Sequence, residues 1–209
     1  MPKIPEASRR RLTLLASLLA SSKEQRITSI QMQRLTGVDR ALIRKDISFT
    51  GYKGGVSNGY KAQELLDAIR AALGLPLPDQ KRFCCIAGLG KLGAALMQCG
   101  IFDESPFKIV AGFDSRVNRT EVLSADFPLY PAAKMETVLP EAKIEFAILA
   151  VEDEQANMMA DRLVKSGVKG IVNFTGQVLE VPEGVAVENV SPLLALNNIV
   201  AAMQSNASR

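Results

Sequence analysis

The sequence predicts an α/β protein with a small helical domain, a Rossmann-like doubly wound parallel sheet and a separate C-terminal helix. Residues 74–81 contain two prolines and a helix-stopping glycine, which is typical of a linker. Apolar strand and helix patterns alternate after this linker, as they do in parallel sheets. The motif GLGKLG over residues 88–93 joins the first of these strands to a helix. We therefore expect domains over residues 1–76 and 77–190, followed by a helix within 191–209.

The composition is that of a globular protein that can form two cores. The chain has 209 residues, of which 47% are hydrophobic and 22% are charged. Domains usually span roughly 100 to 200 residues, so two are expected. No run of about 18 apolar residues is present, and the basic N-terminus lacks the apolar core of a secretory signal. We expect no membrane segment and a cytoplasmic location.

Cysteine and histidine usage argues against metal sites and common catalytic sites. Cys84, Cys85 and Cys99 have neither the even number of a disulfide framework nor the C-x-x-C spacing of a metal site. We expect all three to be small buried hydrophobic side chains. The chain has no histidine, which excludes Ser-His-Asp arrangements and disfavours zinc and non-haem iron sites. The sequence therefore predicts no catalytic residue and no metal ligand.

Positive charge is concentrated in the first domain. Residues 1–61 contain 12 Lys or Arg and 4 Asp or Glu, a net charge of +8, whereas residues 62–209 contain 13 and 18, a net charge of −5. Neutralised phosphates supply most of the sequence-independent affinity for nucleic acids, so a basic domain favours a polyanionic partner. A solvated basic surface without a partner is the alternative that charge alone leaves open.

Three helices are predicted at the start of the first domain. Leucines at helical spacing indicate a helix over residues 8–19, and a second helix capped by Thr28 or Ser29 runs through Leu35. A third helix covers residues 40–48, directly after an aspartate at the N-cap position. The order helix, turn, helix is typical of DNA-binding domains.

The third helix carries the predicted contacts to DNA. In helix-turn-helix proteins this helix lies in the major groove, where Arg44 and Lys45 can meet bases or phosphates. Residues 51–60 contain the glycines and the Asn-Gly step of a tight hairpin or loop, which suits the wing of a winged-helix domain. An amphipathic helix over residues 62–73 completes the core. A plain three-helix bundle with ordinary surface charges is the alternative.

The second domain has the strand and helix pattern of a parallel sheet buried on both faces. Strands are expected over residues 83–87, 109–113, 144–151 and 170–174, with helices ending near 98 and covering 154–166. The last helix, over residues 193–203, has few charges and is a candidate for burial against a partner subunit.

The glycine motif predicts a dinucleotide site. Gly88 permits the tight turn, Gly90 lets the backbone approach a pyrophosphate, and Gly93 allows close packing of helix and strand. The helix N-terminus adds amide donors and a favourable dipole. Asp114 ends the second strand about 20 residues later, where a carboxylate accepts hydrogen bonds from a ribose 2′-OH and disfavours a 2′-phosphate. NAD is therefore favoured over NADP.

With both domains in view, the chain resembles the Rex family of redox-sensing transcriptional repressors over almost its full length. In the first domain the matching residues are Ile4, Pro5, Arg11, Leu12, Ile43, Arg44, Asp46, Ser48, Gly51, Gly59 and Tyr60. In the second they are the three glycines of residues 88–93, Phe113, Asp114, Tyr130, Pro131 and residues 167–174.

The resemblance implies a homodimer that exchanges C-terminal helices, binds double-stranded operator DNA and releases it when NADH binds. Together with the charge pattern, it implies six DNA-binding residues. They are Arg11, Arg44, Lys45, Ser48, Lys53 and Tyr60. It likewise implies NAD(H)-binding residues at the glycine turn and at two strand ends, namely Gly88, Leu89, Gly90, Lys91, Leu92, Gly93, Asp114 and Val151.

The chain departs from the family pattern at several functional positions. Gly55 and Val56 stand where the wing usually carries basic residues. Ser191 and Pro192 replace an aspartate and an aromatic residue at the start of the last helix. Two cofactor-facing loops also differ, with glutamate at 152 and Thr-Gly at 175–176 in place of proline-containing pairs. The sequence is therefore identified as a divergent member whose NADH affinity or operator preference differs from the family pattern.

Two other functions remain open from the sequence. An NAD-dependent oxidoreductase would need an acid or base near the nicotinamide, and without histidine the candidates are Tyr130, lysines or carboxylates in no recognisable catalytic spacing. A nucleotide-binding interaction protein that has lost DNA binding is the third possibility, because the wing lacks its usual cations. The repressor is the leading prediction, and no enzyme activity is expected.

Overall fold

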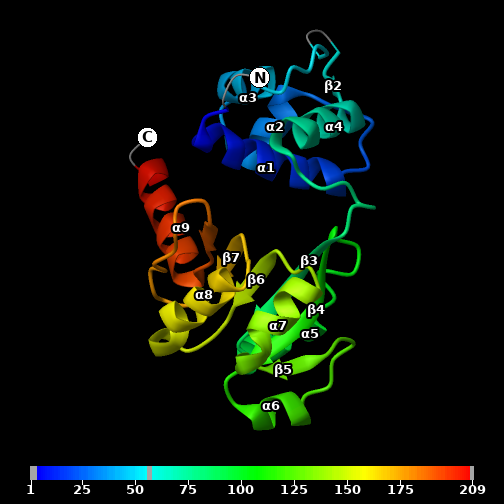
Figure 1. The fold of residues 1–209 in the computed structure, drawn as a ribbon. Helices are drawn as coiled ribbons and strands as arrows, with labels where there is room; N and C mark the ends of the chain where they lie inside the picture. The colour runs from blue at the N-terminus through cyan, green and yellow to red at the C-terminus, as the bar shows by residue number, and fades with distance from the viewer. Residues whose placement is uncertain (1–3, 56–57, 208–209) are drawn as a thin grey trace. The chain divides into compact units, whose positions relative to one another are not determined.

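The computed structural model describes residues 4–55 and 58–207. The chain divides into two compact units, Met1–Leu77 and Pro78–Arg209 (Figure 1). Val56 of the predicted wing lies outside the described residues.

The first unit is helical with one small sheet. Its elements are α1 (Glu6–Ser21), β1 (Arg26–Ile27), α2 (Ser29–Thr36), α3 (Arg40–Ser48), β2 (Tyr60–Lys61) and α4 (Ala62–Leu73). Thr28 caps α2 through a capping box with Gln31, and Gly37 ends α2 in a left-handed conformation. The predicted helix, turn, helix is present.

The predicted wing segment pairs differently from a local hairpin. Among the described residues of 51–60, only Tyr60 lies in a strand, and β2 pairs antiparallel with β1, with Tyr60 opposite Ile27. The glycine signal for a loop was therefore sound, but the strand that closes it comes from before α2. At Gly55, with φ of 102°, an added Cβ would run into the Tyr60 ring, so this backbone conformation favours glycine.

The core of the first unit lies among all four helices. α3 contributes a stripe of Ile43, Asp46 and Ile47, which recur at the spacing of one helix face. Ala41 and Leu42, two other apolar residues of α3, are exposed. Ala41 lies on the far side of this stripe and Leu42 at its edge, so helical geometry rather than apolar character decided which residues are buried.

The second unit is a six-stranded parallel sheet of order β5-β4-β3-β6-β7-β8. Its strands are β3 (Arg82–Ala87), β4 (Phe107–Asp114), β5 (Leu129–Pro131), β6 (Phe146–Leu149), β7 (Gly170–Asn173) and β8 (Ala186–Asn189). Its helices are α5 (Lys91–Gln98), α6 (Val117–Val122), η1 (Ala132–Lys134), α7 (Met135–Glu141), η2 (Asp153–Gln155), α8 (Ala156–Lys165) and α9 (Pro192–Ala207). The order reverses between β3 and β6, as in dinucleotide-binding domains.

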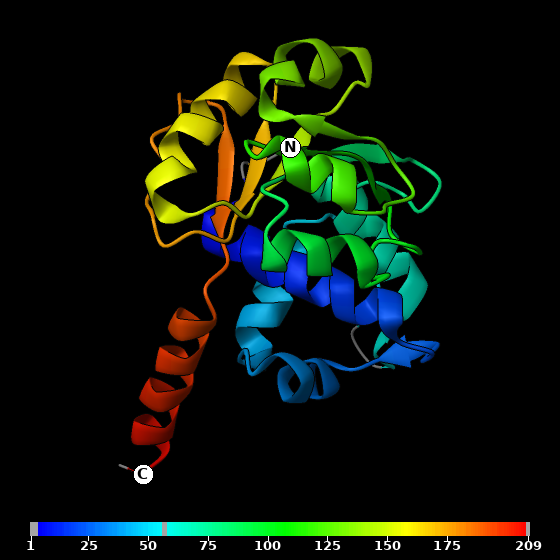
Figure 2. The ribbon, with the colours of Figure 1, turned by 90° about the horizontal axis from the view of Figure 1, so that it is seen from below.

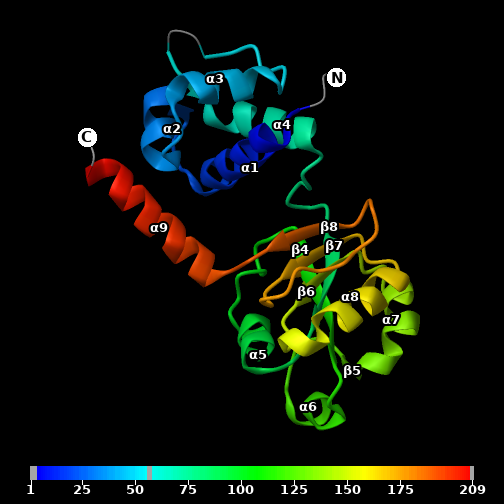
Figure 3. The ribbon, with the colours of Figure 1, turned by 90° about the vertical axis from the view of Figure 1, so that its left-hand side faces the viewer.

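Helices cover both faces of the sheet. Cys84 and Ile86 of β3 face the core that α5 closes, and Cys85 and Ala87 face the core that α7 and α8 close (Figure 3). This alternation confirms the doubly wound parallel sheet. Cys99 is exposed, so the expectation that all three cysteines are buried was wrong for this residue.

Several short elements were not predicted. β5, α6, α7 and β8 are each between three and eight residues long, and their mixed composition gives no clear period. The expected strand over 144–151 is shorter, since β6 covers only Phe146–Leu149. Tertiary pairing against long neighbouring strands stabilises such segments without a strong local signal.

The last helix carries apolar residues on its surface. α9 follows β8 after a short connection (Figure 2). Every described side chain from Ser191 to Gln204 is exposed, including Leu193, Ile199 and Met203. Among the described residues, no helix is long and apolar enough to cross a membrane.

Candidate dinucleotide pocket and nucleic-acid interface

The glycine turn is formed by backbone contacts that leave no room for side chains. Gly88 has φ of 98° and donates its N–H to the Phe113 carbonyl at 2.8 Å. A Cβ on Gly88 would meet the Ala150 carbonyl, and one on Gly93 would meet the Gly88 carbonyl. Gly90 is the N-cap of α5. The turn therefore requires glycine where the strand β3 gives way to the helix.

A pocket of about 320 Å³ lies at the carboxyl ends of β3, β4 and β6. Six predicted cofactor residues line it, namely Gly88, Gly90, Lys91, Leu92, Asp114 and Val151. Leu89 and Gly93 do not, because Leu89 packs in the core beneath α5 and Gly93 is buried against Gly88. The pocket is at the topological switch point, where open α/β sheets bind their ligands.

Asp114 is tied to the glycine turn. Its carboxylate accepts the Leu89 N–H at 2.7 Å through Oδ2 and the Arg116 N–H at 2.7 Å through Oδ1. Only 2% of the residue is exposed. Asp114 therefore holds the loop after β3 and the loop after β4 together, which is a structural role additional to the predicted contact with ribose.

Sequence reasoning missed three polar residues at the pocket, Ser115, Arg116 and Gln155, and had placed Glu152 in a cofactor-facing loop. Ser115 and Arg116 follow β4, and Glu152 and Gln155 follow β6. Arg116 Nη2 lies 3.3 Å from Glu152 Oε1, and Ser115 Oγ donates to Gln155 Oε1 at 3.4 Å. Two polar contacts thus join the loops on either side of the pocket. The position of these polar residues directly after two apolar strands is the feature of the sequence that could have indicated them.

The predicted DNA-contacting residues of α3 are exposed. Asp39 caps the helix by accepting the N–H groups of Ala41 at 2.7 Å and Leu42 at 3.4 Å. Arg44 and Lys45 lie on the exposed surface. Ser48 is exposed too and donates to the Lys45 carbonyl at 2.6 Å, while Lys53 is exposed in the following loop. α3 therefore presents cations on one surface and buries its opposite stripe.

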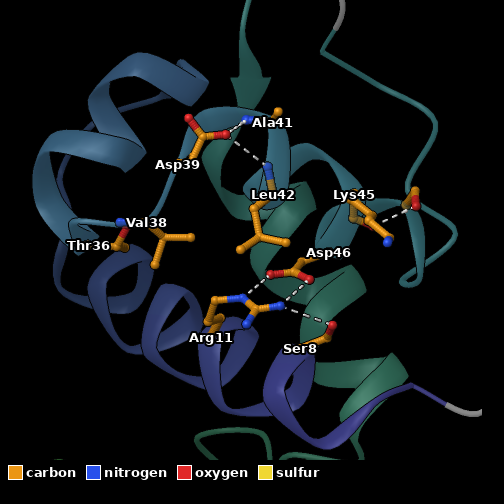
Figure 4. Close-up of polar contacts among 10 residues, drawn as sticks. Ser8, Arg11, Thr36, Val38, Asp39, Ala41, Leu42, Lys45 and Asp46 are labelled. Atoms are coloured by element: carbon orange, nitrogen blue, oxygen red, sulfur yellow. Dashed lines mark hydrogen bonds and ion pairs between the residues drawn. The ribbon is translucent and has the colours of Figure 1, made fainter.

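Arg11, another predicted DNA contact, is paired inside the first unit. Its Nε and Nη2 donate to the two carboxylate oxygens of Asp46 at 2.6 and 2.9 Å, and Nη2 also donates to Ser8 Oγ at 3.3 Å (Figure 4). The hydrogen bonding to Asp46 raises the pKa of Arg11 above its usual value, against a smaller opposing effect of burial. The pair fixes α1 to α3.

Tyr60 is largely buried in the same core. Only 7% of it is exposed, and its ring lies 6.1 Å from that of Tyr52, centroid to centroid. Burial raises the pKa of Tyr60, while the positive charge of Arg44 acts in the opposite direction. The ring therefore supports the region beneath the α3 cations.

The two altered positions at the last helix and in the β7 loop have local roles. Ser191 Oγ accepts the Leu194 N–H at 3.2 Å, which is an N-cap contact at the start of α9. After β7, the Gly176 N–H donates to Asp153 Oδ1 at 2.8 Å.

Within the described residues, no group of His, Cys, Asp or Glu could hold a metal ion.

Comparisons with known proteins place this geometry among repressors. A family model described as "CoA binding domain" matches residues 79–176. The redox-sensing transcriptional repressor Rex of Exiguobacterium sp. strain AT1b is 35% identical over 97% of this chain and 93% of that protein. Rex of Limosilactobacillus reuteri strain DSM 20016 is 32% identical over 95% of this chain and 92% of that protein.

Solved structures give the same result. The Rex-family repressor RSP in complex with β-NADH is 27% identical, with a TM-score of 0.82 over 99% of this chain and 97% of that chain. RSP in complex with β-NAD⁺ and operator DNA is 28% identical, with a TM-score of 0.83 over 99% of this chain and 95% of that chain. The similarity therefore covers both units, including the pocket and the basic helix.

Proposed function

Because the chain belongs to the Rex family of redox-sensing transcriptional repressors, we propose that it represses transcription by binding operator DNA and that NADH releases it. The proposal rests mainly on one observation. A glycine-turn pocket shaped for a dinucleotide and a basic, exposed α3 occur in the same chain. The RSP complexes contain NADH, or NAD⁺ with operator DNA.

The first unit supplies the DNA contacts in this proposal. Arg44 and Lys45 of α3 contact bases or phosphates in the major groove, with Ser48 and Lys53 beside them. Arg11 and Tyr60 act from beneath this surface, since one is paired with Asp46 and the other is buried. These two are positioning residues, although the sequence predicted direct contacts for them.

The second unit holds NAD(H) in this proposal. The amides at the start of α5 and the Lys91 ammonium bind the pyrophosphate, and Gly90 lets it approach. Asp114 lies at the adenosine ribose, while Val151 at the end of β6 lies toward the nicotinamide side. Leu89 and Gly93 shape the turn from below.

Dimerisation and location are further parts of the proposal. α9 exposes Leu193, Leu194, Ile199 and Met203, an apolar surface that a second copy of the chain can bury. A repressor acts where the operator DNA is, so the cytoplasm is the proposed location. The pocket acts as a sensor without turnover, as the repressor relatives suggest; an NAD-dependent oxidoreductase is the second candidate function.

The decisive experiment is operator selection from random DNA pools by the full chain, repeated with NADH and with NAD⁺. We expect one sequence to be enriched at low salt, and NADH to weaken binding to it at least tenfold more than NAD⁺ does. Absence of any enriched sequence would contradict the repressor function and favour an interaction protein that has lost DNA binding. Enrichment without an NADH effect would contradict the sensor role.

A further inference from the structure

The second loop of the pocket carries a cation that no predicted role uses. Arg116 lines the pocket two residues after Asp114, at the end of the strand that borders the adenosine ribose in dinucleotide-binding domains. An arginine near this strand end is the group that accommodates a 2′-phosphate in NADP-binding domains. The position of Arg116 thus bears directly on which dinucleotide the pocket accepts.

The usual obstacle to a ribose phosphate is weakened here. Asp114 would repel such a phosphate if its carboxylate faced the ligand, but it is 2% exposed and accepts the N–H groups of Leu89 and Arg116. Those two donors stabilise the carboxylate within the protein. The sequence-based preference for NAD assumed a carboxylate that interacts only with the ribose, whereas both oxygens of this pocket-lining carboxylate already accept backbone N–H groups.

Arg116 can be recruited by a phosphate. Its guanidinium lies 3.3 Å from the Glu152 carboxylate, and the two side chains are 57% and 63% exposed. Exposed ion pairs of this kind contribute little, so a dianionic phosphate can displace the carboxylate. Ser115 adds a hydroxyl donor at the same loop, and Lys91 adds a second cation across the pocket.

We propose that Arg116 and Ser115 form a subsite for a phosphate ester on the adenosine ribose, so that the pocket binds NADP(H) in addition to NAD(H). This inference rests on the proposed dinucleotide pocket. The same chemistry occurs in coenzyme A, which carries a 3′-phosphate on its adenosine, and the matching family model is described as "CoA binding domain". The shared ligand feature is therefore a phosphorylated adenosine ribose.

Two matched ligand pairs test the subsite in the full chain. Dissociation constants are measured calorimetrically for NADPH against NADH, and for coenzyme A against dephospho-coenzyme A. In at least one pair, we expect the dissociation constant of the phosphorylated ligand to be no more than about tenfold higher than that of its unphosphorylated partner. The pair that does so identifies the source of the phosphate.

Arg116→Ala is the main variant. Because charge-assisted hydrogen bonds to phosphate are lost, we expect about 10- to 100-fold weaker binding of the phosphorylated ligand and less than about twofold change for its unphosphorylated partner. Glu152→Gln should strengthen only the phosphorylated ligand, by about threefold, because it frees the guanidinium. Lys165→Ala, an exposed cation of α8 paired with Asp161, is the charge control and should change nothing.

Three results would separate the possible failures. If NADH binds but both phosphorylated ligands bind more than about 100-fold more weakly than their partners, the subsite is wrong and the proposed function stands. If Arg116→Ala weakens NADH and NADPH equally, the subsite is also wrong, because Arg116 then serves the common part of the ligand. If no dinucleotide binds, both proposals fail.

Discussion

The glycine turn and the α3 surface are stabilised in opposite ways. The turn is formed by backbone in contact with backbone, since Gly88 and Gly93 leave no space for a Cβ. α3 instead presents exposed side chains and depends on one buried stripe and a buried ion pair, Arg11 with Asp46. The turn therefore tolerates almost no substitution, whereas the α3 surface can change its cations without losing the fold.

This contrast agrees with the departures that the resemblance suggests. The three motif glycines match the expected pattern, while the sequence predicts departures from it at positions 55, 152 and 191–192. These positions lie in loops or at a helix start. Changes there alter affinity and specificity at small cost in stability, whereas changes within the turn would remove the pocket.

The largest expected effect tests the turn. Gly93→Ala should weaken NADH binding by at least about 100-fold, because the new methyl group meets the Gly88 carbonyl and the start of α5 must move away. Calorimetric titration of NADH measures the loss, and circular dichroism checks the fold. Ala95→Ser, at an exposed position of the same helix, is the control; NADH binding unchanged in Gly93→Ala would refute the contrast.

The next effect tests the buried pair. Asp46→Ala should destabilise the first unit by about 3 kcal/mol, because removing one partner leaves a partly buried guanidinium unpaired. Hydrogen exchange of the α1 and α3 amides measures this in the full chain. Asp67→Ala, an exposed acid of α4, should change the exchange little. Equal effects in both variants would mean that the pair does not hold α1 to α3.

A smaller effect is expected from the exposed cations. Arg44→Ala combined with Lys45→Ala should weaken operator binding about tenfold or more at 0.1 M salt. The slope of log affinity against log salt concentration should fall in magnitude by about 2, since two phosphate contacts are lost. Thermal unfolding should be unchanged because both side chains are exposed. Unaltered DNA affinity would place the DNA interface elsewhere on the molecule.

The smallest effect concerns the cap of α3. Asp39→Ala should cost about 1 kcal/mol, because the N–H groups of Ala41 and Leu42 lose their acceptor. Asp39→Ser keeps a cap and should remain within a few tenths of a kcal/mol of the parent. Urea unfolding of both variants gives the comparison, and an identical loss in the two would argue against capping.

The sequence by itself determined the features that obey local rules. The glycine turn follows from backbone conformation, the bounds of α3 and α4 follow from caps and apolar period, and the parallel sheet follows from alternating elements. The resemblance that assigned the family also rests on such short segments. Each of these patterns lies within a few neighbouring residues, so it can be recognised in the sequence without knowledge of the tertiary structure.

Only the tertiary structure decided which residues meet. Arg116 and Glu152 come from loops 36 positions apart, and β3 brings them together because it lies between β4 and β6. The pairing of Arg11 with Asp46 likewise depends on the packing of α1 on α3. Strand order and helix packing are non-local, and the sequence carries no spacing from which these pairs could be read.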